Sequence, residues 1–235
     1  MQNRLKRGSL IFIAASFIIG IPSAFLTGEQ PKQVAAGLVI NDEPEQAKSD
    51  KRPWNSEGVH FVPEASYDLK CRVLHRERYW TDEAARFAPL DLAVAWGRAS
   101  DSAVVDKMTV TQGNRHFQLN ATRVPLPGME MVTHNANVHC VPATPEIREK
   151  LLRVQINDFV ELKGYLVNAS WRQRGIVQRL TGSAGDLKSW ETSTRRDDVG
   201  DGSCEILWIE SIEVIQPEPY EPQFRLGPGG IYYQS

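Results

Sequence analysis

A hydrophobic run directly behind a basic flank at the N-terminus constrains this sequence more than any other feature. Arg4, Lys6 and Arg7 precede residues 10–26, an uncharged run in which Ile, Phe, Leu and Ala dominate. At 1.5 Å per residue, a helix of this length reaches about 25 Å, slightly less than the roughly 30 Å hydrocarbon core of a bilayer. The length therefore lies between that of a signal-peptide core and that of a spanning helix.

Two details favour retention of this segment over its removal. Signal-peptide cleavage requires small residues at positions −3 and −1. Cleavage after Ala24 would place Pro22 at −3, and cleavage after Gly28 would place Leu26 there. No cysteine directly follows the run, so lipid modification of the bacterial lipoprotein type is not available. We therefore predict a transmembrane helix or uncleaved signal anchor over residues 10–27.

The basic residues also predict the orientation of this anchor. Three of them lie in the short flank 1–9, whereas acidic residues outnumber basic ones just after the run. The positive-inside tendency then leaves residues 1–9 in the cytoplasm and the rest of the chain outside it. No second hydrophobic run is long enough to span. We expect a single pass through the membrane, with an extracytoplasmic or periplasmic domain.

The remaining composition is that of a globular domain without a strongly basic face. Of the 235 residues, 41% are hydrophobic and 24% charged, which suits one domain with a real core. The net charge of −2 argues against a nucleic acid partner. Cys71, Cys140 and Cys204 form no CxxC pair, which argues against a zinc ribbon. They are either buried thiols or one disulfide plus an odd thiol.

Changes in composition predict the limits of the domain. Residues 28–58 mix Pro, Gln, Lys and acidic residues around one apolar patch, so we expect a tether with one short strand at most. Polar and apolar residues then alternate in a way that predicts a folded domain over 59–216. The Pro- and Gly-rich residues 217–235 are expected to form an irregular tail.

Within the domain we expect strands and two helical stretches. The spacing of Leu90 and Val94 predicts helical structure over 82–107. Thr144, a good N-cap residue directly before Pro145, marks the start of a second helix. The main strands are predicted at 67–74 with Tyr67, Leu69, Cys71 and Val73 on one face, at 108–111 and 116–119 as a hairpin, at 159–167 with a bend at Gly164, at 190–194, and at 204–215 with a break near Glu210.

These elements predict an α+β fold class, in which one mixed, β-rich domain follows the single transmembrane helix. A strand with a central glycine, preceded by an Asn-Asp turn and followed by a distant partner strand, is typical of small twisted barrels. A small barrel of the OB type is therefore one form that this domain could take. Such an analogy concerns the fold and assigns no function.

Several segments of the chain resemble a group of uncharacterised bacterial membrane-anchored proteins that have no assigned function. The resemblance covers roughly residues 60–215 and implies a bacterial origin and a location in the envelope, hence the bacterial inner membrane. It implies no reaction. The segments that carry it are Ser66 to Trp96 ending in LDLAVAWG, then SDSAVVDKM, THNANVHCVPA, DFVELKGYLV and GSCEILWIE.

The densest polar cluster, residues 133–140, is a candidate metal site. His134 and His139 stand five residues apart, and Cys140 follows the second histidine. Imidazole and thiolate ligands would suit Zn²⁺ or Cu²⁺ if this segment formed a loop. On a regular strand, however, positions 134 and 139 point to opposite faces. The alternative is a turn in which asparagine side chains satisfy backbone groups.

A second candidate is an acidic loop made of Asp197, Asp198, Asp201 and Glu205. Hard oxygen ligands and glycines together weakly suggest Ca²⁺, but the acid spacing departs from the EF-hand pattern. The alternative is a solvated connection between two strands, with surface ion pairs that contribute little stability.

Two weaker arrangements concern nucleophilic chemistry and a pocket. The sequence allows a nucleophilic Cys–His pair, formed either by Cys140 with His134 or His139 or by Cys204 with any histidine. No flanking residues, however, place a base and an oxyanion hole beside such a pair. Asp91, Trp96 and Asp101 could line a pocket. Helix caps and a buried tryptophan are the simpler interpretation.

The absence of a catalytic motif favours a non-enzymatic binding or assembly module on the membrane, with other envelope proteins, a wall component or a small ligand as partners. No cofactor is expected. The alternative is a metal-dependent or thiol hydrolase that uses the 133–140 segment. If the side chains of His134, His139 and Cys140 converged on a concave pocket, the hydrolase would be favoured over the binding module.

Overall fold

The computed structural model describes residues 32–173, 180–195, 197–198, 203–221, 224–226 and 232–234. The flank 1–9, the expected anchor 10–27 and Asp201 lie outside these ranges. No helix of the described residues is long and apolar enough to cross a membrane. Strands dominate the described domain and helices are few, which confirms the β-rich character expected of it.

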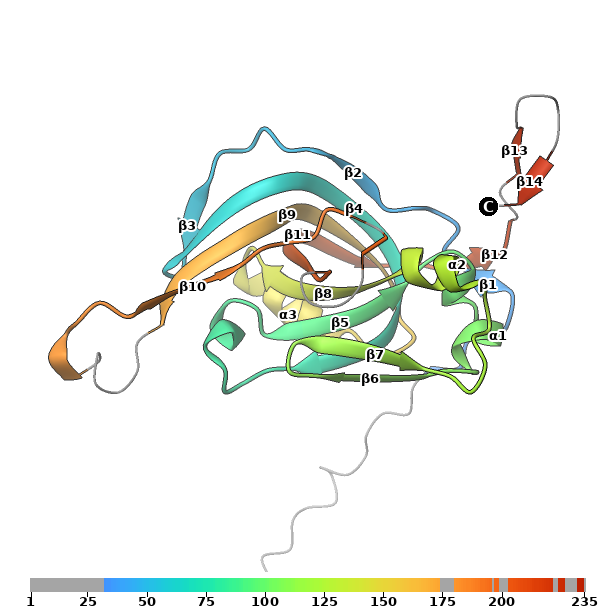
Figure 1. Ribbon diagram of the computed structural model, residues 1–235, viewed down its shortest axis with the longest axis horizontal. Helices are drawn as coiled ribbons and strands as arrows, with labels where there is room; N and C mark the ends of the chain where they lie inside the picture. The colour runs from blue at the N-terminus through green and yellow to red at the C-terminus, as the bar shows by residue number, and fades with distance from the viewer. Residues whose placement is uncertain are drawn as a thin grey trace, which may run out of the picture. The chain divides into compact units, whose positions relative to one another are not determined.

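Five strands form the centre of the domain, and each pairs with two of the others. Their bounds are β4 (Val59–Arg78), β5 (Leu90–Ala95), β8 (Asn135–Pro142), β9 (Phe159–Gln173) and β11 (Glu205–Val214). The pairings run β4–β5–β8–β11–β9 and return from β9 to β4, so the circuit closes. Only β8 and β11 among these neighbours run parallel. Figure 1 shows β4, β9 and β11 arching over β5 and β8.

Shorter elements surround this circuit. The strands are β1 (Leu38–Val39), β2 (Glu45–Lys48), β3 (Trp54–Ser56), β6 (Thr109–Gly113), β7 (His116–Asn120), β10 (Asp186–Trp190), β12 (Glu218–Pro219), β13 (Phe224–Leu226) and β14 (Tyr232–Gln234). The helices are η2 (Glu83–Arg86), η3 (Arg98–Ser100), α1 (Ser102–Val105), α2 (Gly128–Thr133) and α3 (Pro145–Arg153). β6 and β7 form the expected hairpin, and β10 pairs with β9.

The described part of the expected tether 28–58 contains the short strand allowed for it, at Leu38–Val39, and two further strands that were not expected. Both β2 and β3 pair with β4, and the short strand β1 contains the fully buried Val39. All four residues of β2 are exposed, because this strand lies at the edge of the sheet. Three of its four side chains are polar, and an exposed edge strand therefore has the composition of a linker.

The alternating pattern of the first long strand is confirmed. The side chains of Tyr67, Leu69, Cys71 and Val73 are all buried in one hydrophobic cluster inside the strand circuit. Further members of this cluster come from all five central strands and from α3. α3 begins where expected, because the Thr144 hydroxyl accepts a hydrogen bond from the amide of Ile147.

The prediction of helix over 82–107 is wrong at its centre. Residues Leu90–Ala95 form β5, and all six are buried. One face of β5 packs inside the circuit, and other elements cover its opposite face. A strand buried on both faces is continuously apolar, so its sequence lacks the alternation that distinguishes a strand from a helix. Only short helical turns, η2, η3 and α1, remain in this range.

Gly164 lies where the backbone of β11 leaves no room for a side chain on β9. The register of the two strands shifts between Ile209 and Ser211, opposite Lys163 and Gly164, and this confirms the break expected near Glu210. A Cβ atom at position 164 would lie 1.8 Å from the backbone oxygen of Trp208. A glycine is therefore required where the two backbones meet.

Candidate functional site

A row of polar side chains lies on the outer face of β5 and β8, opposite the core. Asp91 on β5 is the register partner of His139 on β8, and Asn137 lies two residues before His139 on the same face. Their neighbours Leu92 and Cys140 point into the core instead. All three polar residues are nonetheless buried, with exposed fractions of 0% for Asp91, 6% for His139 and 3% for Asn137.

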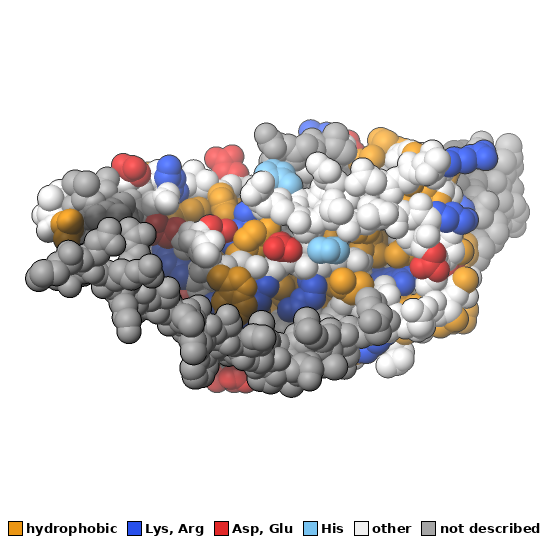
Figure 2. Space-filling view, turned by 90° about the horizontal axis from the view of Figure 1, so that it is seen from below, with side chains coloured by type: hydrophobic (Ala, Val, Ile, Leu, Met, Phe, Trp, Pro, Cys, Tyr) orange, Lys and Arg blue, Asp and Glu red, His pale blue; other side chains and the backbone are white. Residues whose placement is uncertain are grey.

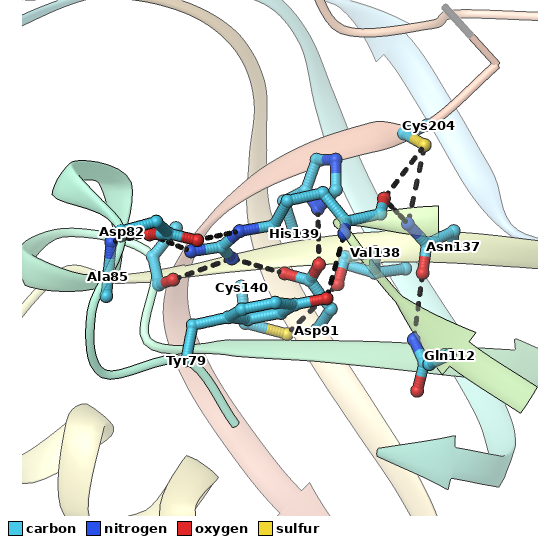
Figure 3. A network of polar contacts seen from close by, with 12 residues as sticks. Tyr79, Asp82, Ala85, Asp91, Gln112, Asn137, Val138, His139, Cys140 and Cys204 are labelled. Atoms are coloured by element: carbon cyan, nitrogen blue, oxygen red, sulfur yellow. Dashed lines mark hydrogen bonds and ion pairs between the residues drawn. The ribbon is translucent and has the colours of Figure 1, made fainter. Parts of the chain in front are cut away.

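The turn of the β6–β7 hairpin supplies the cation that balances Asp91. Asn114 and Arg115 both have positive φ, as a two-residue hairpin turn requires. The Arg115 guanidinium donates to Asp91 Oδ1 at 2.8 Å, and to both carboxylate oxygens of Asp82. It also lies 3.6 Å above the ring of Tyr79. Asp91 thus contacts Arg115 through one oxygen and His139 through the other, and Figure 3 shows the His139 ring directed at Asp91.

His139 is held by Asp91 on one side and by an aromatic ring on another. Its Nδ1 lies 3.0 Å from Asp91 Oδ2 in an ion-pair contact that is not aligned as a hydrogen bond. Its ring packs against the Trp190 ring, with the centroids 4.9 Å apart. Burial alone would lower the pKa of His139, but Asp91 and Cys204 outweigh this effect and raise the pKa to about 9.

Cys204 joins the row from the neighbouring parallel strand. Glu205 at the start of β11 pairs with Val138, so the residue before it lies level with Asn137. Asn137 Nδ2 donates to Cys204 Sγ at 3.4 Å and to the backbone oxygen of Arg115 at 2.9 Å, and its Oδ1 accepts from Gln112. Cys204 is therefore joined to the row through Asn137, and His139 is joined to Asp91 (Figure 3).

A pocket of about 470 Å³ opens beside this row. Hydrophobic side chains from β7, the following loop and α2 form much of its wall, among them Phe117, Leu119 and Met131. Cys204, Glu205, Asn137, Arg195 and Asp198 contribute polar atoms. Pockets of this size and mixed lining are typical of sites for small molecules.

Comparison with known proteins does not identify the chain. No protein-family model, no curated protein and no solved structure matches it. The interpretation of the site therefore rests on its geometry and chemistry.

The structure separates the three side chains of the proposed metal site. His134 lies at the end of α2 and contacts Glu43 at 3.0 Å, whereas Cys140 is fully buried in the core and His139 faces outward. The hydrogen bond with Glu43 raises the pKa of His134. Within the described ranges, no group of three His, Cys, Asp or Glu side chains is arranged to hold a metal ion. The cause is the strand alternation of β8.

The acidic residues of the proposed loop also have different surroundings. Asp197 pairs with Arg195 at the surface, and Asp198 accepts a hydrogen bond from Ser193. Glu205 is buried at the start of β11 and lines the pocket with Asp198. Asp201 lies outside the described residues. The carboxylates of Asp197 and Asp198 are thus accounted for by protein partners, without a bound Ca²⁺.

All three cysteines are free thiols. Sequence reasoning placed Cys204 with any histidine and Asp91 at a pocket, but it did not join them. It gave Arg115 no role in a site, and it included Asn137 only as part of the 133–140 segment, where the expected bond from an asparagine side chain to a backbone group is present. One signal was present: Asp91 is the single charge inside the apolar stretch LDLAVAW, and a buried carboxylate requires a partner.

Proposed function

We propose that this chain is a bacterial inner-membrane protein, anchored by its N-terminal segment, whose extracytoplasmic domain is a non-enzymatic binding module of the OB type. Its ligand is a small, largely apolar molecule with one polar end. The pocket between the β6–β7 hairpin, α2 and the start of β8 is the observation that carries this proposal.

The order of the strand pairings supports the OB type. Taken along the chain, the five central strands pair in the order first, second, third, fifth, fourth and back to first, and the third and fifth run parallel. α3 connects the third strand to the fourth. OB domains bind ligands on the face of their second and third strands and with the loops that join the first strand to the second and the fourth to the fifth. The equivalent strands here are β5 and β8, which carry the polar row beside the pocket.

The surface around the pocket supports a small ligand rather than a nucleic acid. Figure 2 views the side on which β6 and β7 lie, and on its described part acidic and basic side chains are interspersed with hydrophobic ones. A phosphate backbone would need a stripe of positive charge. A small apolar molecule needs only the enclosed hydrophobic wall and a few polar groups for orientation.

Filling the pocket provides the test of ligand binding. Ala121 lines the pocket and is exposed, whereas the adjacent Thr122 is exposed but is not part of the wall. Ala121→Trp is expected to weaken binding of the probe 6-fluoro-2-naphthoate at least about tenfold, because the indole occupies apolar volume that the probe needs. Fluorine NMR line widths measured with the full chain in lipid nanodiscs report the binding.

Thr122→Trp is the matched control, since it adds the same side chain to the same loop and should bind the probe as the wild type does. Equal affinity in all three proteins would contradict the proposal, as would a wild type that does not bind the probe. Partition into lipid is the same in all three samples and cancels in the comparison.

The anchor is tested separately with the full chain. We expect the protein to stay in the membrane pellet after an alkaline carbonate wash, and its domain to be cleaved by protease added outside spheroplasts. Phe17→Asp should release the chain, because a carboxylate at mid-membrane costs roughly 3 kcal/mol. Wild-type protein recovered in the cytosol would contradict the proposed location.

A further inference from the structure

We propose that Cys204 is a nucleophilic thiol that exchanges with small disulfides, and that His139 and Asp91 are its positioning residues. This activity goes beyond ligand binding and does not depend on the identity of the ligand. It is a covalent modification site in the wall of the pocket.

Of the three thiols, only Cys204 can meet a reagent. Cys71 and Cys140 are fully buried in the hydrophobic cluster inside the strand circuit, and burial raises the pKa of both thiols. Cys204 is partly exposed and lines the pocket. A thiol must be accessible and able to ionise in order to react.

His139 can stabilise the thiolate of Cys204. The Asp91 carboxylate holds Nδ1 at 3.0 Å and is itself held by Arg115 at 2.8 Å. The raised pKa of His139 keeps the ring protonated at neutral pH. In Cys–His pairs generally, an imidazolium stabilises the thiolate that attacks. Asp91 thus acts on the sulfur through His139.

Asn137 adds a direct hydrogen bond to the sulfur. Its Nδ2 donates to Sγ at 3.4 Å, and the amide is oriented by the donation from Gln112 to its Oδ1 at 2.9 Å. A hydrogen bond to a charged acceptor is stronger than one to a neutral acceptor. The amide therefore offers the sulfur a donor during attack, while the resting thiol also donates to the backbone oxygen of Arg115 at 3.9 Å.

The hydrogen bonds of the Asn137 amide also indicate that the thiol attacks a disulfide sulfur rather than a carbonyl carbon. Acyl transfer needs donors aimed at a developing oxyanion. The two hydrogens of the Asn137 amide are already directed at Sγ and at the backbone oxygen of Arg115. Attack on a disulfide develops charge on the leaving sulfur and requires no such site.

In the exchange, the Cys204 thiolate attacks one sulfur of a disulfide R–S–S–R. A new S–S bond joins Cys204 to one R–S group as the original S–S bond breaks. The other R–S⁻ leaves with the electron pair and takes a proton from solvent or from His139. The disulfide is the oxidant, so electrons balance without a cofactor.

The reaction is tested on the full chain with bis(2-hydroxyethyl) disulfide, a neutral probe, and mass spectrometry of digested peptides. Wild-type protein is expected to form the adduct at Cys204, and Cys204→Ser should form none there. His139→Gln and Asp91→Asn should slow the reaction about tenfold at pH 7, because the thiolate loses its partner. His60→Gln, an exposed histidine elsewhere on β4, should react at the wild-type rate.

The pH profile separates this role from a structural one. The ratio of wild-type to His139→Gln rates should fall toward one above about pH 9, where His139 loses its proton. Asn137→Ala offers a second comparison if His139→Gln does not fold, and it should react severalfold more slowly than the wild type. Equal rates in folded wild type and variants, or a wild-type adduct at Cys71 or Cys140 instead, would overturn the inference. Probe binding by 6-fluoro-2-naphthoate is independent of these outcomes, so the two proposals can fail separately.

Discussion

Gly164→Ala is expected to destabilise the domain by about 3 kcal/mol or more. The added methyl group would lie 1.8 Å from the Trp208 carbonyl oxygen, 2.9 Å from its carbon and 3.2 Å from Ile209 Cα. All three are backbone atoms of β11, so no side chain can move aside to make room. β9 and β11, which are neighbours in the strand circuit, must therefore separate at this position. Such overpacking typically costs about 1–3 kcal/mol, and more where the backbone itself must shift.

Urea-induced unfolding of the full chain, followed by tryptophan fluorescence, measures this loss. Gly113→Ala is the matched control, because no atom lies within 4 Å of a Cβ at that strand position. It should change stability by less than about 1 kcal/mol. Similar unfolding midpoints for Gly164→Ala and Gly113→Ala would show that β11 does not approach β9 as described.

The stability of the domain is expected to fall by roughly 3 kcal/mol as the pH rises from 6 to 10. His139 has a pKa of about 9 in the folded protein and an ordinary value near 6.5 when unfolded. The folded state therefore holds its proton more tightly. The resulting stabilisation is fully present below pH 6.5 and is lost as the pH rises through about 9.

Other groups titrate in the same range, so the result is the difference between wild type and His139→Gln. The variant has a lower stability at pH 6, because Asp91 loses one of its two cationic partners, but it should lack this component of the pH slope. Free energies of unfolding at several pH values give both curves. Parallel curves would contradict a protonated His139 in the folded state.

Local patterns in the sequence account for much of the framework. The alternation from Tyr67 to Val73, the cap at Thr144 and the turn before β7 each depend on residues close together in the chain. Their predictions were confirmed because strand alternation, capping and turn geometry are local effects. The exposed strand β2 and the doubly buried strand β5 were missed, because their environment comes from distant partners.

In the candidate site, too, the contacts between residues that are distant in the sequence could not be predicted. Its row joins Asp91, His139 and Cys204, which are far apart in the sequence, and no spacing rule connects them. The histidines that sequence proximity grouped, His134 and His139, have different partners. Adjacent positions on a strand point to opposite faces, so closeness along the chain predicted the wrong neighbours.

The sequence by itself determined the positions of the amphipathic strands, the start of α3, and a hydrophobic N-terminal run behind a basic flank. Each follows from short-range periodicity, capping or charge. Only the tertiary structure decided that the five strands close into a circuit and that Arg115, Asp91, His139 and Cys204 meet on its outer face. Strand pairing between distant segments depends on how all their side chains pack together, and that information is not contained in any single stretch of the chain.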